Sequence, residues 1–143
     1  MRISQNGIDL IKRFEGCRTK AYQDTGGVYT IGWGHIKGVK RGDTAMLAEC
    51  EKFLQDDLAD AEEALSDLVK VPLHQNQYDA LCAFVFNVGK KRFESSTLLK
   101  KLNAGLFDQA AAQFLRWIYD NGKVITGLVN RRQSESDLFK GKV

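Results

Sequence analysis

The feature that most constrains the fold of this chain is a long amphipathic stretch between residues 43 and 68. Apolar residues recur there every three or four positions, as they do on one face of a helix, and acidic residues fill the positions between. We expect a helix that begins at Asp43 or Thr44 and runs for about seven turns. A helix this long in a small protein often bridges two lobes. The recurring apolar residues are Leu47, Cys50, Leu54, Leu58, Ala61, Leu65 and Leu68.

The chain before this helix combines a short helix with a β-hairpin. Residues 6–15 carry apolar residues on one side, with Asn6 as the expected N-cap and Gly16 as the stop, so that Glu15 falls on the last turn. Residues 21–35 are rich in aromatic and β-branched residues, and a turn sequence at 24–27 divides them. We therefore expect strands only in the first third of the chain.

The chain after the long helix is predicted to be helical. Residues 76–88 are apolar almost all round, which is typical of a buried helix, and Gly89 ends it. Shorter helices are expected from Ser95 or Ser96 to Leu102, from Asp108 to Ile118 and over residues 128–139, and Asn121-Gly122 marks a turn. The predicted class is α+β, mainly α, with six or seven helices in one domain over residues 1–143.

Composition limits the possible functions. Apolar residues make up 43% and charged residues 27% of the chain, which is typical of a globular domain. No apolar run reaches the ~20 residues of a membrane span, and no signal peptide is evident. The three cysteines lack CxxC spacing, so we expect reduced thiols, a cytosolic origin and no metal site. The net charge of +3 slightly favours an anionic polymer as partner, but a nucleic-acid-binding domain is usually more basic.

Three residues around the hairpin could carry hydrolytic chemistry. Glu15 lies at a helix C-terminus, where the helix dipole and burial beside aromatic residues both favour the protonated carboxyl of a general acid. Asp24, in the turn, is expected to be solvated and ionised, and Thr30 on the returning strand could hold a water molecule. Two carboxyl groups in unlike environments are what hydrolysis of a glycosidic bond requires.

His35 follows these residues and could act as a base. However, no serine or cysteine occupies a nucleophile motif such as GxSxG. We therefore favour a structural ion pair for His35. Gly32 and Gly34 do not complete a phosphate-binding GxGxxG loop.

The sequence resembles the phage-type lysozymes, the endolysins of glycoside hydrolase family 24, and is most similar to the endolysins of lambda-like phages. The Glu15, Asp24 and Thr30 spacing matches that family, and the resemblance extends over almost the whole chain. The segments that carry it are Phe14-Glu15-Gly16, Ala21-Tyr22-Gln23-Asp24, Thr30-Ile31-Gly32-Trp33-Gly34-His35, Asn76-Gln77-Tyr78-Asp79-Ala80-Leu81, Phe86-Asn87-Val88-Gly89, Ser96-Thr97-Leu98-Leu99 and Gly127-Leu128-Val129-Asn130-Arg131-Arg132.

The resemblance implies a role for each matching residue. Glu15 matches the general acid, Asp24 the second catalytic carboxyl and Thr30 its partner in positioning the attacking water. It implies an inverting reaction in a cleft between two lobes, a hairpin lobe over residues 15–58 and a helical lobe over 1–14 and 59–143. It also implies a His35–Asp57 ion pair, and substrate contacts from Phe86, Asn87, Thr97 and Gln113.

The implied activity is that of a muramidase, which hydrolyses the β-1,4 bond between N-acetylmuramic acid and N-acetylglucosamine in peptidoglycan without a cofactor. A lytic transglycosylase and a non-catalytic wall-binding module are the alternatives. The chain lacks the N-terminal signal-arrest-release segment of many relatives. We therefore expect the protein to stay in the host cytoplasm until a holin permeabilises the membrane, and then to act on the wall in the periplasm. We also expect a monomer without stable membrane or nucleic-acid association.

Overall fold

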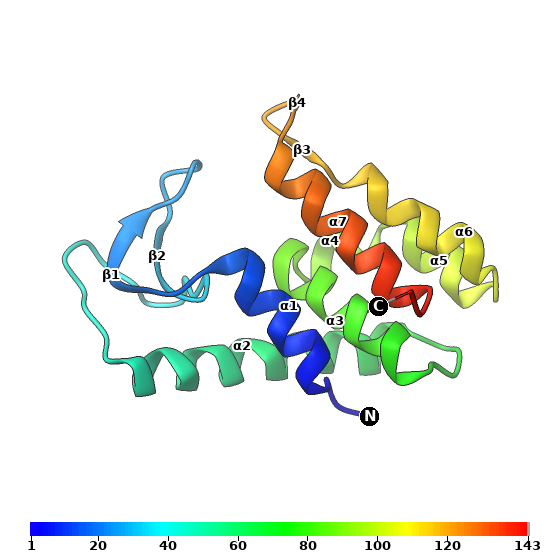
Figure 1. The fold of residues 1–143 in the computed structure, drawn as a ribbon, viewed down its shortest axis with the longest axis horizontal. Helices are drawn as coiled ribbons and strands as arrows, with labels where there is room; N and C mark the ends of the chain where they lie inside the picture. The colour runs from blue at the N-terminus through cyan, green and yellow to red at the C-terminus, as the bar shows by residue number, and fades with distance from the viewer. Residues whose placement is uncertain (143) are drawn as a thin grey trace.

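A computed structural model describes residues 1–142. In this range it contains seven α-helices, one short 3-10 helix and two two-stranded antiparallel sheets, which confirms the mainly helical α+β class (Figure 1). Figure 1 shows the long helix α2 running from below the hairpin to behind α1 and α3. The elements are α1 Gln5–Glu15, β1 Arg18–Gln23, β2 Tyr29–Gly32, α2 Leu47–Leu68, α3 Gln75–Val88, α4 Lys90–Glu94, α5 Thr97–Asn103, α6 Phe107–Gln113, the 3-10 helix Phe114–Arg116, β3 Tyr119–Asp120, β4 Lys123–Val124 and α7 Thr126–Phe139.

Helix α2 begins later than the sequence predicts, at Leu47 instead of Asp43 or Thr44. The residues before it pair with strand β1: Asp43 accepts a hydrogen bond through its backbone oxygen from Ala21, and Ala45 donates to Thr19, both at 2.8 Å. These contacts hold the segment extended. Met46 is the N-cap residue of the helix, and its backbone N–H donates to the Glu49 carboxylate at 2.9 Å.

Strands β1 and β2 form the predicted hairpin, although β1 starts at Arg18 and not at residue 21. The register shifts between Arg18 and Tyr22, which indicates a bulge in β1. Arg18 lies opposite Gly32, the last residue of β2, and Gly32 in turn lies against Cys50 of α2. The hairpin is therefore seated on the first turns of the long helix.

Helix α1 is capped differently from the prediction. Ser4, not Asn6, is the N-cap residue, and its side chain bonds to the buried Asp79 of α3 instead of to the helix backbone. Ser4 also donates its backbone N–H to Asp79 at 2.8 Å. The predicted end of α1 is confirmed, since Gly16 has a φ of 65° directly after Glu15.

The hydrophobic core is centred on α3, as its apolar sequence predicts. Helices α1, α2 and α7 all pack against α3, and Phe84 in its middle is fully buried. The Phe84 ring meets Phe93, Phe114 and Trp117 edge-on, with ring centroids 5.3 to 6.3 Å apart. This core fixes α3, whose residues Val85, Phe86 and Asn87 line one wall of the site described below, and α7, which packs against α3.

Three predictions about the C-terminal half are wrong. Strands are not confined to the first third, because Asn121-Gly122 joins β3 to β4 in a tight hairpin. Helix α6 starts at Phe107 with Leu106 as its cap, so Asp108 lies inside it, and regular helix ends at Gln113 instead of Ile118. The short helix α4 was not anticipated. The predicted cap of α5 is confirmed, since the Ser96 hydroxyl accepts the Leu99 N–H at 3.1 Å.

Candidate functional site

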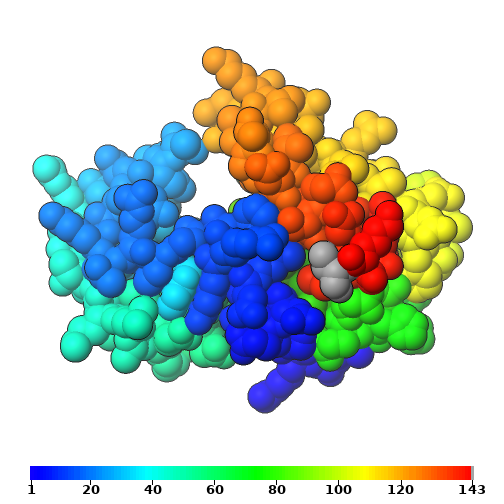
Figure 2. Space-filling view, viewed as in Figure 1, coloured from blue at the N-terminus to red at the C-terminus, as the bar shows by residue number. Residues whose placement is uncertain are grey.

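A cleft of about 470 Å³ separates the β1–β2 hairpin from the helical part of the molecule. In the space-filling view it opens between the hairpin and the segment that carries β3 and β4 (Figure 2). Across its outer side the two hairpin tips meet, because the Thr25 hydroxyl donates to the Asp120 carboxylate at 3.0 Å. The cleft is lined by Glu15, Tyr22, Asp24, Thr30, Gly34, Ile36, Lys37, Asp57, Asp60, Ala61, Val85, Phe86, Asn87, Gly89 and Lys90.

Glu15 enters the cleft from the C-terminal end of α1, where Gly16 turns the chain away. Its side chain is 19% exposed, so it is largely covered and still accessible to a ligand. Gly34 makes this placement possible: a Cβ atom there would lie 2.7 Å from Glu15 Oε1, and its φ of 77° favours glycine. The absence of a side chain at Gly34 therefore makes room for the carboxyl group.

Arg131 of α7 holds the Glu15 carboxyl, a contact that the sequence reasoning missed. Its Nη1 donates to Glu15 Oε2 at 2.6 Å, and its Nη2 donates to the backbone oxygen of Ala83 at 3.0 Å. Burial lowers the pKa of Arg131, but the charges of Glu135 and Glu15 outweigh this and hold that pKa above its ordinary value. Arg131 is therefore a permanent cation behind the carboxyl group.

The same network continues through α7 to the far wall of the cleft. Glu135, which is fully buried, accepts from Arg131 Nε at 3.1 Å and from Arg132 Nη1 at 2.5 Å. Arg132 also donates to Asn87 Oδ1, and Asn87 lines the cleft. The sequence signal for this network is that Arg131 and Arg132 precede Glu135 by four and three residues, which places them on one helix face. Glu15 and Asn87 are thus both held by hydrogen bonds from one buried network of charged side chains.

Asp24 lies in the β1–β2 turn with one carboxylate oxygen engaged and the other free. Its Oδ1 accepts hydrogen bonds from the backbone N–H groups of Gly26 and Val28, at 2.9 and 2.8 Å. Within residues 1–142 no protein donor reaches Oδ2. The Thr30 hydroxyl donates its proton to the Val28 backbone oxygen at 3.0 Å, so its oxygen can only accept from a molecule in the cleft.

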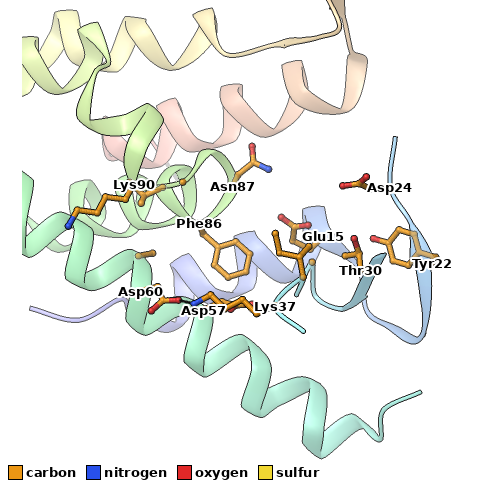
Figure 3. Close-up of a pocket in the computed structure, with 15 residues that line it drawn as sticks. Glu15, Tyr22, Asp24, Thr30, Lys37, Asp57, Asp60, Phe86, Asn87 and Lys90 are labelled. Carbon is orange, nitrogen blue, oxygen red and sulfur yellow. Dashed lines mark hydrogen bonds and ion pairs between the residues drawn. The ribbon is translucent and has the colours of Figure 1, made fainter. Parts of the chain in front are cut away.

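Figure 3 shows Glu15, Thr30 and Asp24 together at the hairpin end of this cleft. The structure thus brings together three residues that the sequence places nine and six positions apart. A carboxyl group, a free carboxylate oxygen and a hydroxyl acceptor face one space. Such a set can donate a proton and orient a water molecule.

His35 and Asp57 lie in contact beside the cleft. His35 Nδ1 is 2.8 Å from Asp57 Oδ2, and the two side chains are 8% and 17% exposed. The His35 ring also stacks on Phe53 of α2, with centroids 4.3 Å apart. These contacts join the segment after β2 to the long helix.

The four predicted substrate-binding residues fall into two places. Phe86 and Asn87, at the end of α3, line the cleft opposite the hairpin (Figure 3). Thr97 and Gln113 do not line it. They share a separate hollow of about 540 Å³ with Arg116 and Trp117. Arg132 connects the two places, since its Nε donates to the Trp117 backbone oxygen at 3.0 Å.

Charged side chains that the sequence reasoning did not select also line the cleft. Lys37 pairs with Asp60, and this hydrogen bond raises the pKa of Lys37. Lys90 pairs with Asp67 of α2 at 2.7 Å.

Residues 1–142 contain no cluster of three or more His, Cys, Asp or Glu side chains placed to hold a metal ion. Of the helices in this range, none has the length and hydropathy needed to cross a bilayer.

Comparison with known proteins gives matches over nearly the whole chain. A family model described as phage lysozyme matches residues 12–135. An endolysin of Acyrthosiphon pisum secondary endosymbiont phage 1 is 47% identical over 144 residues, which cover 98% of this chain and 99% of that protein.

Solved structures show the same similarity. A P22 lysozyme variant superimposes with a TM-score of 0.82 at 44% identity, over 98% of this chain and 99% of the other. The muramidase domain of SpmX from Asticaccaulis excentricus has a TM-score of 0.88 at 39% identity, over 96% of this chain and 97% of the other. The cleft of this chain is therefore built on a backbone that these proteins share.

Proposed function

Because this chain belongs to the phage lysozyme family, and is thus an enzyme of peptidoglycan lysis, we propose that it hydrolyses the β-1,4 bond between N-acetylmuramic acid and N-acetylglucosamine with inversion. The observation that carries this proposal is the meeting of Glu15, Asp24 and Thr30 in one cleft. The lining of the same cleft extends from the hairpin to Lys90 of α4.

Glu15 is the general acid of the proposed reaction. It protonates the glycosidic oxygen as the bond to the anomeric carbon breaks, so that the leaving sugar departs as a neutral alcohol. Arg131 holds Oε2 from the protein side. Oε1 is therefore the oxygen that carries and donates the proton.

Asp24 and Thr30 orient the attacking water. One water proton is donated to Asp24 Oδ2, the oxygen that the turn leaves free, and the other to the Thr30 hydroxyl oxygen. A lone pair of the water oxygen points to the anomeric carbon from the face opposite Glu15. Asp24 takes up a proton as the new C–O bond forms, which completes an inverting displacement.

Substitution of the two carboxyl groups tests this assignment. Glu15→Gln and Asp24→Asn each preserve shape, and the amide oxygen introduced by Asp24→Asn can still accept from Gly26 and Val28. We expect both variants to stay folded, with Asp24→Asn melting near the wild type and Glu15→Gln melting lower, because Arg131 loses the charge of one carboxylate partner. Each should lose at least about 10²-fold in activity on purified sacculi. Thr25→Ser, which retains the hairpin-tip hydroxyl, is the matched control. Normal turnover by Asp24→Asn would overturn the paired-carboxyl mechanism.

A lytic transglycosylase is the second candidate, because it cleaves the same bond with a single glutamate. In that case the muramic acid C6 hydroxyl attacks in place of water and an anhydro sugar forms. The free Asp24 Oδ2 and the Thr30 acceptor favour water. Mass spectrometry of the digest separates the two, since the anhydro product is lighter by one water.

The route to the wall is also part of the proposal. We infer that the enzyme acts in the periplasm as a monomer, after a holin has permeabilised the inner membrane. Coexpression with and without a holin, followed by culture turbidity, tests this route. Lysis without the holin would contradict it.

A further inference from the structure

A pair of cysteines outside the catalytic set lies where the hairpin meets the long helix. Cys17 directly precedes β1 and is exposed, and Cys50 lies in the first turns of α2 with its side chain fully buried. Neither contributes to the proposed reaction. Cys82, the third cysteine, is buried in α3.

Cys17 and Cys50 both lie near Gly32, the last residue of β2. Arg18, the neighbour of Cys17, lies opposite Gly32 in the hairpin register. A Cβ atom at Gly32 would be 3.3 Å from Cys50 Cβ and 3.4 Å from its sulfur. Cys17 thus directly precedes the strand that pairs with Gly32, and Gly32 packs on Cys50.

Burial raises the pKa of Cys50, and the neighbouring Cys17 thiol raises it further. The burial keeps Cys50 protonated and unreactive on its own. Cys17, at the surface, is the sulfur that a reagent in solution can reach.

We propose that Cys17 and Cys50 form a redox modification site, which is a dithiol in a reducing compartment and an intramolecular disulfide in an oxidising one. The disulfide would join Cys17, two residues after Glu15, to the long helix. The loop that it closes would contain the hairpin with Asp24 and Thr30. The biological setting rests on the proposed function, because action on the wall would move the protein into an oxidising compartment.

The oxidant is a disulfide, either a disulfide oxidoreductase or oxidised glutathione. The Cys17 thiolate attacks one sulfur of that disulfide, which releases the other sulfur as a thiolate and leaves Cys17 in a mixed disulfide. Cys50 then loses its proton and attacks the Cys17 sulfur, which releases the second thiolate. The protein loses two electrons and two protons, and the oxidant becomes two thiols.

The closed loop runs from residue 17 to residue 50, which contains the whole hairpin. A disulfide stabilises chiefly by restricting the unfolded chain, and for a loop of this size in a protein of this length we expect Tm to rise by about 10 °C. The hairpin would thereby be fixed on α2.

The test is to incubate the purified protein with oxidised glutathione, unfold it in the presence of an alkylating agent, and measure mass and Tm. We expect one alkylated thiol, Cys82, a linked peptide that contains Cys17 and Cys50, and a higher Tm that dithiothreitol reverses. Cys82→Ala should retain the shift. Cys17→Ser, a change at an exposed position, should abolish it.

A glutathione adduct on Cys17, a dimer linked through Cys17, or an alkylated Cys50 after oxidation would overturn the proposal. So would an intramolecular link with unchanged Tm in the wild type. None of these readouts depends on activity. Failure of the proposed muramidase reaction would therefore be seen separately, in the sacculus assay.

Discussion

At the scale of single residues, Arg131 connects Glu15 to the helical core. Its guanidinium bonds to Glu15, Glu135 and the backbone of α3, and its side chain is 5% exposed. Removal of one member of a buried charge network leaves uncompensated charge in the interior. Such a residue stabilises the molecule and also holds the Glu15 carboxyl in place.

Arg131→Met should therefore lower the free energy of unfolding by about 3–5 kcal/mol. The measurement is urea unfolding followed by circular dichroism. Arg13→Met is the control, because Arg13 also joins α1 to α7, through a bond to Ser134 at 3.0 Å, but at the surface. It should cost about 1 kcal/mol or less. Equal losses in the two variants would show that the buried network does not support the fold.

At the scale of elements, His35 and Asp57 join the segment after the hairpin to α2. The pair is partly buried, so its energy should lie between that of exposed and fully buried pairs, at about 1–3 kcal/mol of coupling. A double-mutant cycle with His35→Asn and Asp57→Asn measures this. The exposed Lys52–Asp56 pair on the same helix is the control and should couple by a few tenths of a kcal/mol. Additive losses of unfolding free energy in the two single variants would show that His35 and Asp57 do not interact.

Helix α3 makes stability sensitive to alkaline pH. Burial raises the pKa values of Tyr78 and Cys82 far above their ordinary values of 10.0 and 9.0, with a smaller contribution from Glu62. These groups stay protonated in the folded protein and ionise on unfolding. Stability is therefore full below pH 9 and falls as pH rises above it.

The fall contributed by each group should approach about 1.4 kcal/mol per pH unit. Unfolding free energies between pH 7 and 11 should decline less steeply in Cys82→Ala than in the wild type. Cys17→Ala, at an exposed position, should leave the slope unchanged. A slope that is the same in all three proteins would contradict the role of Cys82.

The elements show which parts of the fold can be predicted from sequence. The apolar run of α3, the turn after Glu15 and the Ser96 cap depend on local chemistry, and the sequence predicts them. The start of α2 does not depend on local chemistry alone. Residues 43–45 pair with β1, and this pairing keeps Asp43 and Thr44 out of the helix. Ser4 replaces Asn6 as cap for a similar reason, since the distant Asp79 binds it.

The candidate site shows the same division. Glu15, Asp24 and Thr30 lie close together in the sequence, and the hairpin that unites them is locally encoded. Arg131 is 116 residues from Glu15, and its contact arises only when α7 packs on α3. Thr97 and Gln113 were assigned to the substrate by resemblance, and their hollow outside the cleft depends on how α5 and α6 pack.

At the scale of the whole molecule, the two hairpin tips close a ring around the cleft through Thr25 and Asp120 (Figure 2). We infer that a glycan strand that enters from the side requires the tips to part. In a Cys17→Ser background, a disulfide between Thr25→Cys and Asp120→Cys should therefore abolish activity on sacculi, and dithiothreitol should restore it. The Thr25→Cys single variant is the control. Full activity of the cross-linked protein would show that the tips need not separate.

The central claim is that water, held by Asp24 and Thr30 opposite Glu15, attacks the anomeric carbon. Time-resolved proton NMR of a defined glycan oligomer during cleavage tests this most directly. Inverting hydrolysis of the β-linked substrate predicts that the new reducing end appears first as the α-anomer and then equilibrates. A β-anomer as first product, or an anhydro end with no reducing sugar, would contradict the account.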